Sequence, residues 1–171
     1  LETDNLQADV YAPSSLSPHP ALVLLHPSGF NRAFMRELSA MYAAAGFWVA
    51  NADHRVGEGL ARSTADAIAA VDFVKDNADE FDVDPNRIAM VGFSGGARAA
   101  LQANYAEDID IGAVISIAGI LGSREQVIDG TESPAFLIHG EQDPNRPPAV
   151  GQAIVDTVTA RGGIAELASV D

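Results

Sequence analysis

Cysteine is absent from the 171-residue sequence, and lysine occurs only once, at Lys75. Without cysteine, these residues cannot form a disulfide bond, a thiolate metal site or a cysteine nucleophile, although this absence does not fix the cellular compartment. Basic residues as a whole are scarce, because 10 of them stand against 24 acidic residues and give a formal net charge of -14. So acidic a surface repels nucleic acid and anionic lipid, and we expect neither as a partner.

Long hydrophobic runs are also missing. Hydrophobic residues make up 47% of the chain, which is enough to bury a substantial core. No stretch reaches the roughly 18 consecutive apolar residues typical of a membrane-spanning helix. We therefore expect one soluble globular domain, with a cytoplasmic location favoured over secretion. No group of histidines and carboxylates has the spacing of metal ligands, so we expect neither a metal nor another cofactor.

The segment from Arg87 to Ala97 carries the strongest chemical signal. It reads RIAMVGFSGGA, in which an apolar, strand-forming run leads through a glycine-rich turn into an alanine-rich, helical segment. This is the G-x-S-x-G pattern of a nucleophile on a sharp strand-to-helix turn, where a side chain in place of either glycine would collide with a neighbouring element. The turn exposes the hydroxyl of Ser94 and directs the first N–H groups of the helix to the same place. We interpret Ser94 as the nucleophile of an acyl-transfer site.

Two other interpretations of this turn are a plain tight connection and a phosphate-binding loop. A phosphate-binding loop of the common kind has Lys-Ser or Lys-Thr after its glycines, and a dinucleotide-binding loop reads G-x-G-x-x-G. Neither pattern is present at residues 92–96, which read Gly-Phe-Ser-Gly-Gly. The phosphate-binding interpretation is therefore disfavoured.

Segments typical of strands and helices alternate along the chain. Apolar runs predict strands at 6–11, 21–25, 47–50, 87–91, 111–118, 135–138 and 162–171. Helical periodicity predicts helices at 31–45, from 63 or 64 to 81, at 97–105 and at 148–160. The first of these helices has Asn31 as its expected N-cap and Gly46 as its stop, and its apolar face consists of Phe34, Leu38, Met41, Tyr42 and Ala45. This alternation predicts an α/β fold with a doubly wound, mostly parallel sheet, helices on both faces and functional sites at the carboxyl ends of the strands.

A serine nucleophile needs a base that accepts its proton and an acid that orients the base. The turn after the strand at 135–138 offers two carboxylates, Glu141 and Asp143. We favour Asp143, because it lies deeper in the loop and precedes a proline that would fix the turn. The loop after the preceding strand has no carboxylate before Glu125. The alternative is that Asp143 is an ordinary solvated turn residue.

The negative charge that develops during acyl transfer needs two hydrogen-bond donors. The backbone N–H of Gly95 is the expected first donor, and the second should come from the loop after the strand that ends at Leu25. Pro27 has no N–H, so the second donor is Ser28 or Gly29, and we favour Ser28. The alternative is that this loop is only a strand-to-helix turn.

The sequence as a whole resembles the α/β-hydrolases, and within them the dienelactone hydrolase-like and related small carboxylesterases. Five segments carry the resemblance: residues 9–13 (DVYAP), 25–29 (LHPSG), 84–88 (DPNRI), 92–96 (GFSGG) and 138–143 (IHGEQD). The resemblance implies ester hydrolysis through an acyl-enzyme on Ser94, with Asp143 in the acid position. Two departures from the family concern the site. Dienelactone hydrolases proper use cysteine as the nucleophile, where this chain has Ser94. Pro27 replaces a glycine that is common in esterases after the histidine corresponding to His26.

A larger departure from the hydrolase pattern concerns the catalytic histidine. The order of the triad in this fold is serine, acid, histidine, yet no histidine follows Asp143. The four histidines of the chain are His19, His26, His54 and His139. Only His54, after the third predicted strand, is a candidate for a substitute base.

A simpler explanation is that the chain is part of a longer hydrolase domain. Residues 162–171 resemble the last strand before the catalytic histidine loop of this family, so we expect the histidine a few residues beyond Asp171. The segment 119–133 is too short to hold a lid or a cap domain, which favours an open site for small or exposed acyl esters. The competing hypothesis is a non-catalytic binding protein with a hydrolase fold that lacks the base.

Overall fold

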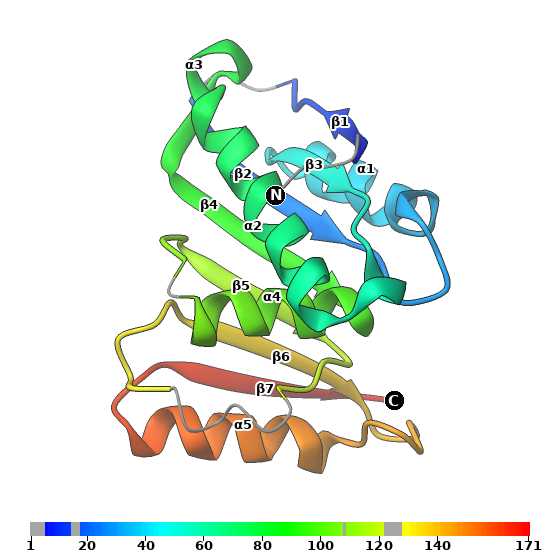
Figure 1. Cartoon of the computed structure of the whole chain (residues 1–171), viewed down its shortest axis with the longest axis vertical. Helices are drawn as coiled ribbons and strands as arrows, with labels where there is room; N and C mark the ends of the chain where they lie inside the picture. The colour runs from blue at the N-terminus through cyan, green and yellow to red at the C-terminus, as the bar shows by residue number, and fades with distance from the viewer. Residues whose placement is uncertain (1–5, 15–17, 108, 122–127) are drawn as a thin grey trace.

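The computed structural model describes residues 6–14, 18–107, 109–121 and 128–171. In these residues a seven-stranded sheet has the order β1-β3-β2-β4-β5-β6-β7 (Figure 1). The strands are β1 (Ala8–Tyr11), β2 (His19–Leu25), β3 (Trp48–Ala52), β4 (Val83–Phe93), β5 (Ala113–Ile117), β6 (Ala135–Gly140) and β7 (Ala165–Val170). β1 runs antiparallel to β3, and the other neighbouring pairs are parallel. The mostly parallel sheet predicted from the sequence is therefore confirmed.

Helices cover both faces of this sheet, as the sequence predicts. The main helices are α1 (Arg36–Ala44), α2 (Leu60–Asp76), α4 (Gly95–Ala106) and α5 (Pro148–Ala160). Figure 1 shows α2 and α4 side by side in front of the strands, with α5 alongside β7. These three helices enclose the larger hydrophobic cluster, which includes Val23 and Met90, and α1 packs on the smaller cluster around Leu24 and Val91. Successive strand residues point to opposite faces, so a strand covered on both faces is apolar at every position.

The first helix is rotated about its own axis relative to the prediction, so a different set of its residues faces the sheet. Asn31 is its N-cap, as expected, but the first turn, η1 (Arg32–Met35), is a 3-10 helix and only then does α1 begin. A 3-10 turn has about three residues rather than 3.6, so it rotates the residues that follow it around the helix axis. Phe34 and Met41, predicted on the apolar face, are 46% and 67% exposed, whereas Met35 is buried.

Two further segments differ in detail from the prediction, and a third lies partly outside the described residues. The long second helix divides at Asn77 into α2 and the short α3 (Ala78–Phe81). The strand predicted at 87–91 is longer in the structure, because β4 already includes residues 84–86, where the N–H of Asn86 donates to the carboxylate of Asp84. The segment 119–133, predicted to be too short for a cap, includes residues 122–127, which lie outside the described residues, as does Glu125. None of the helices in the described part of the chain is long and apolar enough to cross a bilayer.

Candidate active site

Ser94 lies between the carboxyl end of β4 and the first turn of α4, in a backbone conformation that amino acids with a side chain rarely adopt. Its φ and ψ are 52° and -104°. Such a conformation costs about 1–3 kcal/mol and persists only where the surrounding structure imposes it. The N–H of Ser94 donates to the carbonyl of Ile117 in β5 at 2.8 Å, and the carbonyl of Ser94 accepts from Arg98 at 3.0 Å. These bonds fix the sharp turn at the end of the strand.

The two glycines that flank Ser94 are required by close packing. A Cβ atom on Gly92 would overlap the backbone of Ala97 in α4. A Cβ on Gly96 would lie 2.6 Å from the carbonyl carbon of Leu25 and 2.8 Å from the carbonyl oxygen of His26. Real Cβ atoms do not approach backbone so closely, so both positions exclude any side chain. The local geometry is that of a nucleophile on a strand-to-helix turn.

Ser28 lies directly beside the first residue of α4. The nearest atom to a Cβ built on Gly95 is Ser28 Oγ, and the backbone nitrogen of Ser28 is 3.0 Å away. Gly95 is the first residue of α4, and the first four N–H groups of a helix have no partner within it. No hydrogen bond between described residues uses the N–H of Ser28, which is exposed. The structure therefore brings Ser28, Gly95 and Ser94 together, while Gly29 has nothing within 4 Å of its own Cβ position.

Asp143 lies in the loop after β6 and is half-buried. Its Oδ1 accepts hydrogen bonds from the N–H groups of Asn145, at 2.8 Å, and Arg146, at 3.0 Å. These two bonds, with the charges of Arg146 and His139, lower the pKa of Asp143 below 3.8 against a small opposing effect of desolvation. The carboxylate is therefore charged at neutral pH, as an acid that orients an imidazole must be.

Strand pairing relates Asp143 to Ser94. β5 pairs with β4 on one side and with β6 on the other, and all three strands are parallel. Ser94 follows the end of β4 and Asp143 lies in the loop that follows β6, so both residues are at the carboxyl edge of the sheet. Neighbouring strands are about 4.8 Å apart, which separates β4 and β6 by about 10 Å. An imidazole that connects the two side chains would have to bridge this separation.

His54, the candidate substitute base, has no free ring nitrogen. It is buried, its Nδ1 is 2.6 Å from Ser63 Oγ, and its Nε2 is 2.8 Å from the carbonyl oxygen of His26. A carbonyl only accepts hydrogen bonds, so Nε2 carries the proton and Nδ1 accepts from the hydroxyl of Ser63. Burial lowers the pKa of His54 below 6.5. These contacts make His54 a structural residue and argue against a role as base.

The other three histidines are also occupied or distant. His26 is buried, and its Nδ1 is 3.0 Å from the carbonyl oxygen of Pro27. His139 is fully buried, with Nδ1 2.9 Å from the carbonyl oxygen of Arg146, whereas its Nε2 has no hydrogen-bond partner among the described residues and is enclosed beside Gly151 in α5. His19 begins β2, whereas Ser94 lies at the opposite, carboxyl edge of the sheet. None of the four supplies a free imidazole beside Ser94.

Phe30, Phe34 and Phe93 form a partly exposed aromatic group that adjoins Ser94 through Phe93 and that the sequence did not predict. The ring of Phe34 lies 4.7 Å from that of Phe30 and 5.5 Å from that of Phe93, centroid to centroid. Phe93 precedes Ser94 in the chain, and Phe30 follows the Ser28–Gly29 turn. Phe30 is 59% exposed. The four-residue spacing of Phe30 and Phe34 was the available signal, but the prediction placed Phe34 on the apolar face of the first helix.

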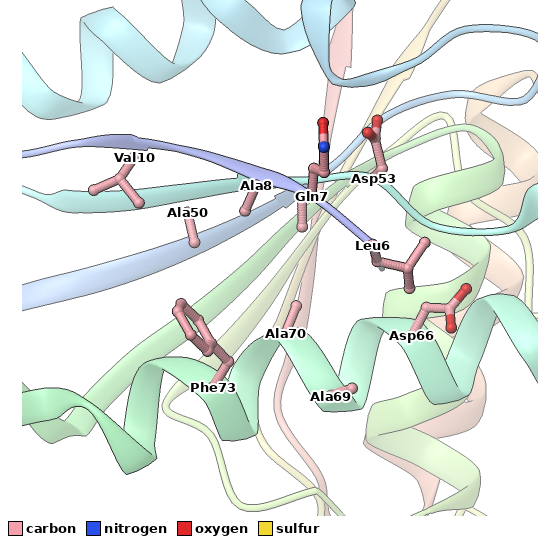
Figure 2. Close-up of a pocket in the computed structure, with 11 residues that line it drawn as sticks. Leu6, Gln7, Ala8, Val10, Ala50, Asp53, Asp66, Ala69, Ala70 and Phe73 are labelled. Atoms are coloured by element: carbon pink, nitrogen blue, oxygen red, sulfur yellow. The ribbon is translucent and has the colours of Figure 1, made fainter. Parts of the chain in front are cut away.

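A separate pocket of about 390 Å³ lies between β1, β3 and α2 (Figure 2). Its walls are mainly apolar and include Leu6, Val10 and Phe73, with the carboxylates of Asp53 and Asp66 at its edge. It contains none of the predicted site residues. Among the described residues, no group of three histidines and carboxylates is placed to hold a metal ion.

Comparison with known proteins is consistent with this geometry. Residues 8–118 match the sequence model of the BD-FAE family. Esterase 2 of Thermogutta terrifontis, phosphonylated by cyclosarin, is 21% identical with a TM-score of 0.87, and the match covers 99% of this chain and 79% of that one. Its apo form is 22% identical (TM-score 0.87) and its propionate-bound form 22% (TM-score 0.88), each match covering 99% of this chain and 80% of the other. A comparison with curated proteins gave no match.

The fold and these matches define the class of protein. The chain has an α/β-hydrolase fold, which confirms the broader resemblance seen in the sequence. It belongs to the BD-FAE family, a family of α/β-hydrolase-type esterases. The matched range includes Ser28, Ser94 and Gly95 but ends before Asp143. The narrower likeness to dienelactone hydrolases stays a prediction.

Proposed function

We propose that this chain forms a serine esterase site within a single hydrolase domain that has no inserted cap. The observation that carries the proposal is the strained turn at Ser94, with the N–H groups of Gly95 and Ser28 beside it. A turn of this kind presents one hydroxyl and two unpaired donors to the same small volume. Family membership and the esterase neighbours support the same chemistry. The dienelactone hydrolase-like motifs make a small carboxylesterase the narrower form of the proposal.

In the proposed reaction Ser94 Oγ forms a bond to the carbonyl carbon of the ester while a base takes the hydroxyl proton. The carbonyl oxygen becomes an oxyanion, which the N–H groups of Gly95 and Ser28 stabilise. The tetrahedral intermediate then breaks its bond to the alcohol, which leaves with the proton from the base. Water attacks the acyl-enzyme by the same route and releases the carboxylic acid. Asp143 is proposed to orient the base and to stabilise its charged form.

The base of this scheme is not one of the four histidines in the chain. In the chain order typical of the fold the base would follow Asp143, and in space it would lie between the side chains of Asp143 and Ser94. We therefore assign the nucleophile to Ser94, the oxyanion donors to Gly95 and Ser28, and the acid to Asp143. We assign the base to none of the residues described here.

Small or exposed acyl groups are the proposed substrates. The propionate-bound and butyrate-bound forms of the T. terrifontis esterase show that this neighbour binds short acids. In this chain Phe30, Phe34 and Phe93 provide an apolar surface beside Ser94 on which a short acyl chain or an alcohol group would lie. Rapid cleavage of long-chain triglyceride with poor turnover of short-chain p-nitrophenyl esters would contradict this part of the proposal.

A second candidate function is supported by the histidine contacts. Because His26, His54 and His139 all use ring nitrogens within the fold, a protein with only these histidines would bind an ester without turning it over. Loss of the triad histidine from other serine hydrolases reduces kcat about a millionfold. Such a protein would be a binding module with a hydrolase fold.

A fluorophosphonate probe on the full-length protein tests the proposal and separates it from the alternative. We expect covalent labelling of Ser94, loss of labelling in S94A, and p-nitrophenyl butyrate hydrolysis that disappears in the same variant. D143N should retain the turn, because an amide oxygen still accepts from the N–H groups of Asn145 and Arg146, yet hydrolysis should fall by about 10⁴-fold. A wild-type protein that binds p-nitrophenyl butyrate but is neither labelled nor active would instead be the binding module.

A further inference from the structure

The β2–η1 loop (residues 26–31) carries Ser28, so the position of the second oxyanion donor depends on what holds this loop. The loop is exposed at Ser28 and Gly29, and its internal hydrogen bonds include that from the N–H of Phe30 to the carbonyl of Pro27, at 3.3 Å. The other internal bond joins His26 Nδ1 to the carbonyl of Pro27 at 3.0 Å, so neither bond uses Ser28 or Gly29 and the loop is held mainly by its two ends. Both ends contact residues at the carboxyl end of β3.

The upstream end of the loop is held by His54. Its Nε2–H donates to the carbonyl oxygen of His26 at 2.8 Å, and the two imidazole rings lie 4.4 Å apart. The backbone N–H of His54 approaches His26 Nε2 at 3.4 Å, which is a weak contact. His26 is thus fixed through its carbonyl and its ring.

The downstream end is held by Asp53 through Arg32. The backbone N–H of Arg32 donates to Asp53 Oδ1 at 2.9 Å, and the Arg32 guanidinium donates to Asp53 Oδ2. The side-chain amide of Asn51 donates to the carbonyl of Arg32 at 2.8 Å. Asp53 therefore binds both the backbone and the side chain of the residue that follows the loop, and such a charge-assisted pair fixes geometry as well as adding energy.

The Arg32 guanidinium has two further partners. It donates to Asp9 Oδ1 at 3.0 Å and to Gln7 Oε1 at 3.0 Å, so three acceptors surround it. These contacts raise the pKa of Arg32, with the hydrogen bond that it donates to Asp9 as the largest cause. Figure 2 shows the side chains of Gln7 and Asp53 pointing the same way, away from α2 and from the floor of the pocket. The carboxylate of Asp53 therefore interacts with the residue that follows the loop and not with the interior of the pocket.

We propose that Asp53 is a positioning residue for the Ser28 N–H, acting through Arg32 on the β2–η1 loop. This inference rests on the proposed esterase function, because it concerns the second donor of that site. An oxyanion donor acts only within about 2.7–3.1 Å of the developing charge. A displacement of about 1 Å at a site of this kind costs about a hundredfold in rate. Holding the loop at Arg32 is thus a requirement for turnover rather than for folding alone.

The test compares D53A with D9A in the full-length protein. Both variants remove a carboxylate from the Arg32 guanidinium, but only D53A also removes the acceptor of the Arg32 backbone N–H. We expect D53A to lower kcat for p-nitrophenyl butyrate by about 10- to 100-fold with KM within about twofold of wild type. D9A should keep kcat within about twofold of wild type, because the backbone bond remains. D53N should recover part of the loss, since its amide oxygen still accepts from the Arg32 N–H.

A second measurement does not depend on catalysis. NMR order parameters of the Ser28 and Gly29 amides should be near those of rigid backbone, about 0.85, in wild type and D9A, and below about 0.6 in D53A. Unchanged order parameters and kcat in D53A would overturn the proposal, as would equal losses of kcat in D53A and D9A. If D53A does not fold, D53L, whose side chain is of similar shape but accepts no hydrogen bond, carries both measurements. If the wild type does not hydrolyse esters, the proposed function fails, and the order parameters alone decide whether Asp53 holds the loop.

Discussion

The backbone nitrogen of Ser28 lies 3.0 Å from the position that a Cβ atom on Gly95 would occupy. Residues 28 and 95 belong to the turns after two adjacent parallel strands, β2 and β4, which pair up to Leu25 and Gly92. Their N–H groups are thereby brought to the same side of Ser94. Any side chain at residue 95 would contact Ser28. A larger residue at position 95 would therefore displace residue 28.

G95A should reduce activity much more than stability. The new methyl group would overlap Ser28 Oγ and approach the Ser28 nitrogen and Val56 at 3.0 Å each, which displaces the second oxyanion donor. We expect kcat for a short-chain ester to fall by about tenfold or more. The free energy of unfolding should change by less than about 1 kcal/mol, because alanine favours the first turn of a helix over glycine by a similar amount.

The double variant S28G/G95A identifies the cause of that loss. Ser28 Oγ is the atom nearest to the new methyl group, so its removal should restore much of the lost kcat. G57A is the matched control, because no atom lies within 4 Å of the corresponding Cβ position. Activity in S28G/G95A as low as in G95A would show that the Ser28 side chain is not the cause.

S94G should make the protein more stable while it abolishes hydrolysis. The positive φ of Ser94 is costly for a residue with a Cβ and almost free for glycine. We expect the melting temperature to rise by about 2–4 °C, which corresponds to about 1 kcal/mol for a chain of this size. S94A keeps the Cβ and should show no such rise in thermal unfolding followed by circular dichroism. Equal melting temperatures for S94G and S94A would contradict a strained backbone at this turn.

Features set by short stretches of sequence could be predicted. The helix expected at 148–160 is α5, with the same bounds, because Pro148 at its start and Gly162 after its end mark both limits. The turn at Ser94 was recognisable because three glycines within five residues leave few other conformations. The mostly parallel arrangement of the sheet followed from the alternation of its strands with helices.

Features that depend on contacts distant in sequence could not be predicted. Arg32 and Asp53 are 21 residues apart, and nothing near either residue indicates that they bind each other. The exposure of Phe34 depends on a 3-10 turn that periodicity does not reveal. The choice between Ser28 and Gly29 depends on how closely β2 and β4 approach at their ends.

H54Q should remove one component of acid destabilisation. Burial lowers the pKa of His54 in the folded protein below its ordinary 6.5, and the charge of His26 adds to this effect. The hydrogen bond to the backbone of His26 and the charges of Asp66 and Asp53 oppose it. As pH falls below about 6.5, the unfolded chain therefore binds a proton that the folded protein does not, and stability decreases until the folded pKa is reached. H54Q retains a donor for the His26 carbonyl but cannot be protonated. The free energy of unfolding, measured with urea between pH 7.5 and about 5, should decrease less in H54Q than in wild type. Identical slopes of this free energy against pH would contradict the prediction.

F34A should weaken the binding of short acyl chains without a comparable loss of stability. Phe34 is 46% exposed and its ring contacts those of Phe30 and Phe93, the residue before Ser94, so we expect the ring to touch bound substrate. One buried methylene contributes about 0.8 kcal/mol, so loss of such a contact should raise KM for p-nitrophenyl butyrate about fourfold. KM for the acetate ester, whose acyl chain is shorter, should change less. F73A is the control, because Phe73 is 48% exposed but lines the pocket at α2, and equal changes of KM in F34A and F73A would remove the aromatic group from the proposed site.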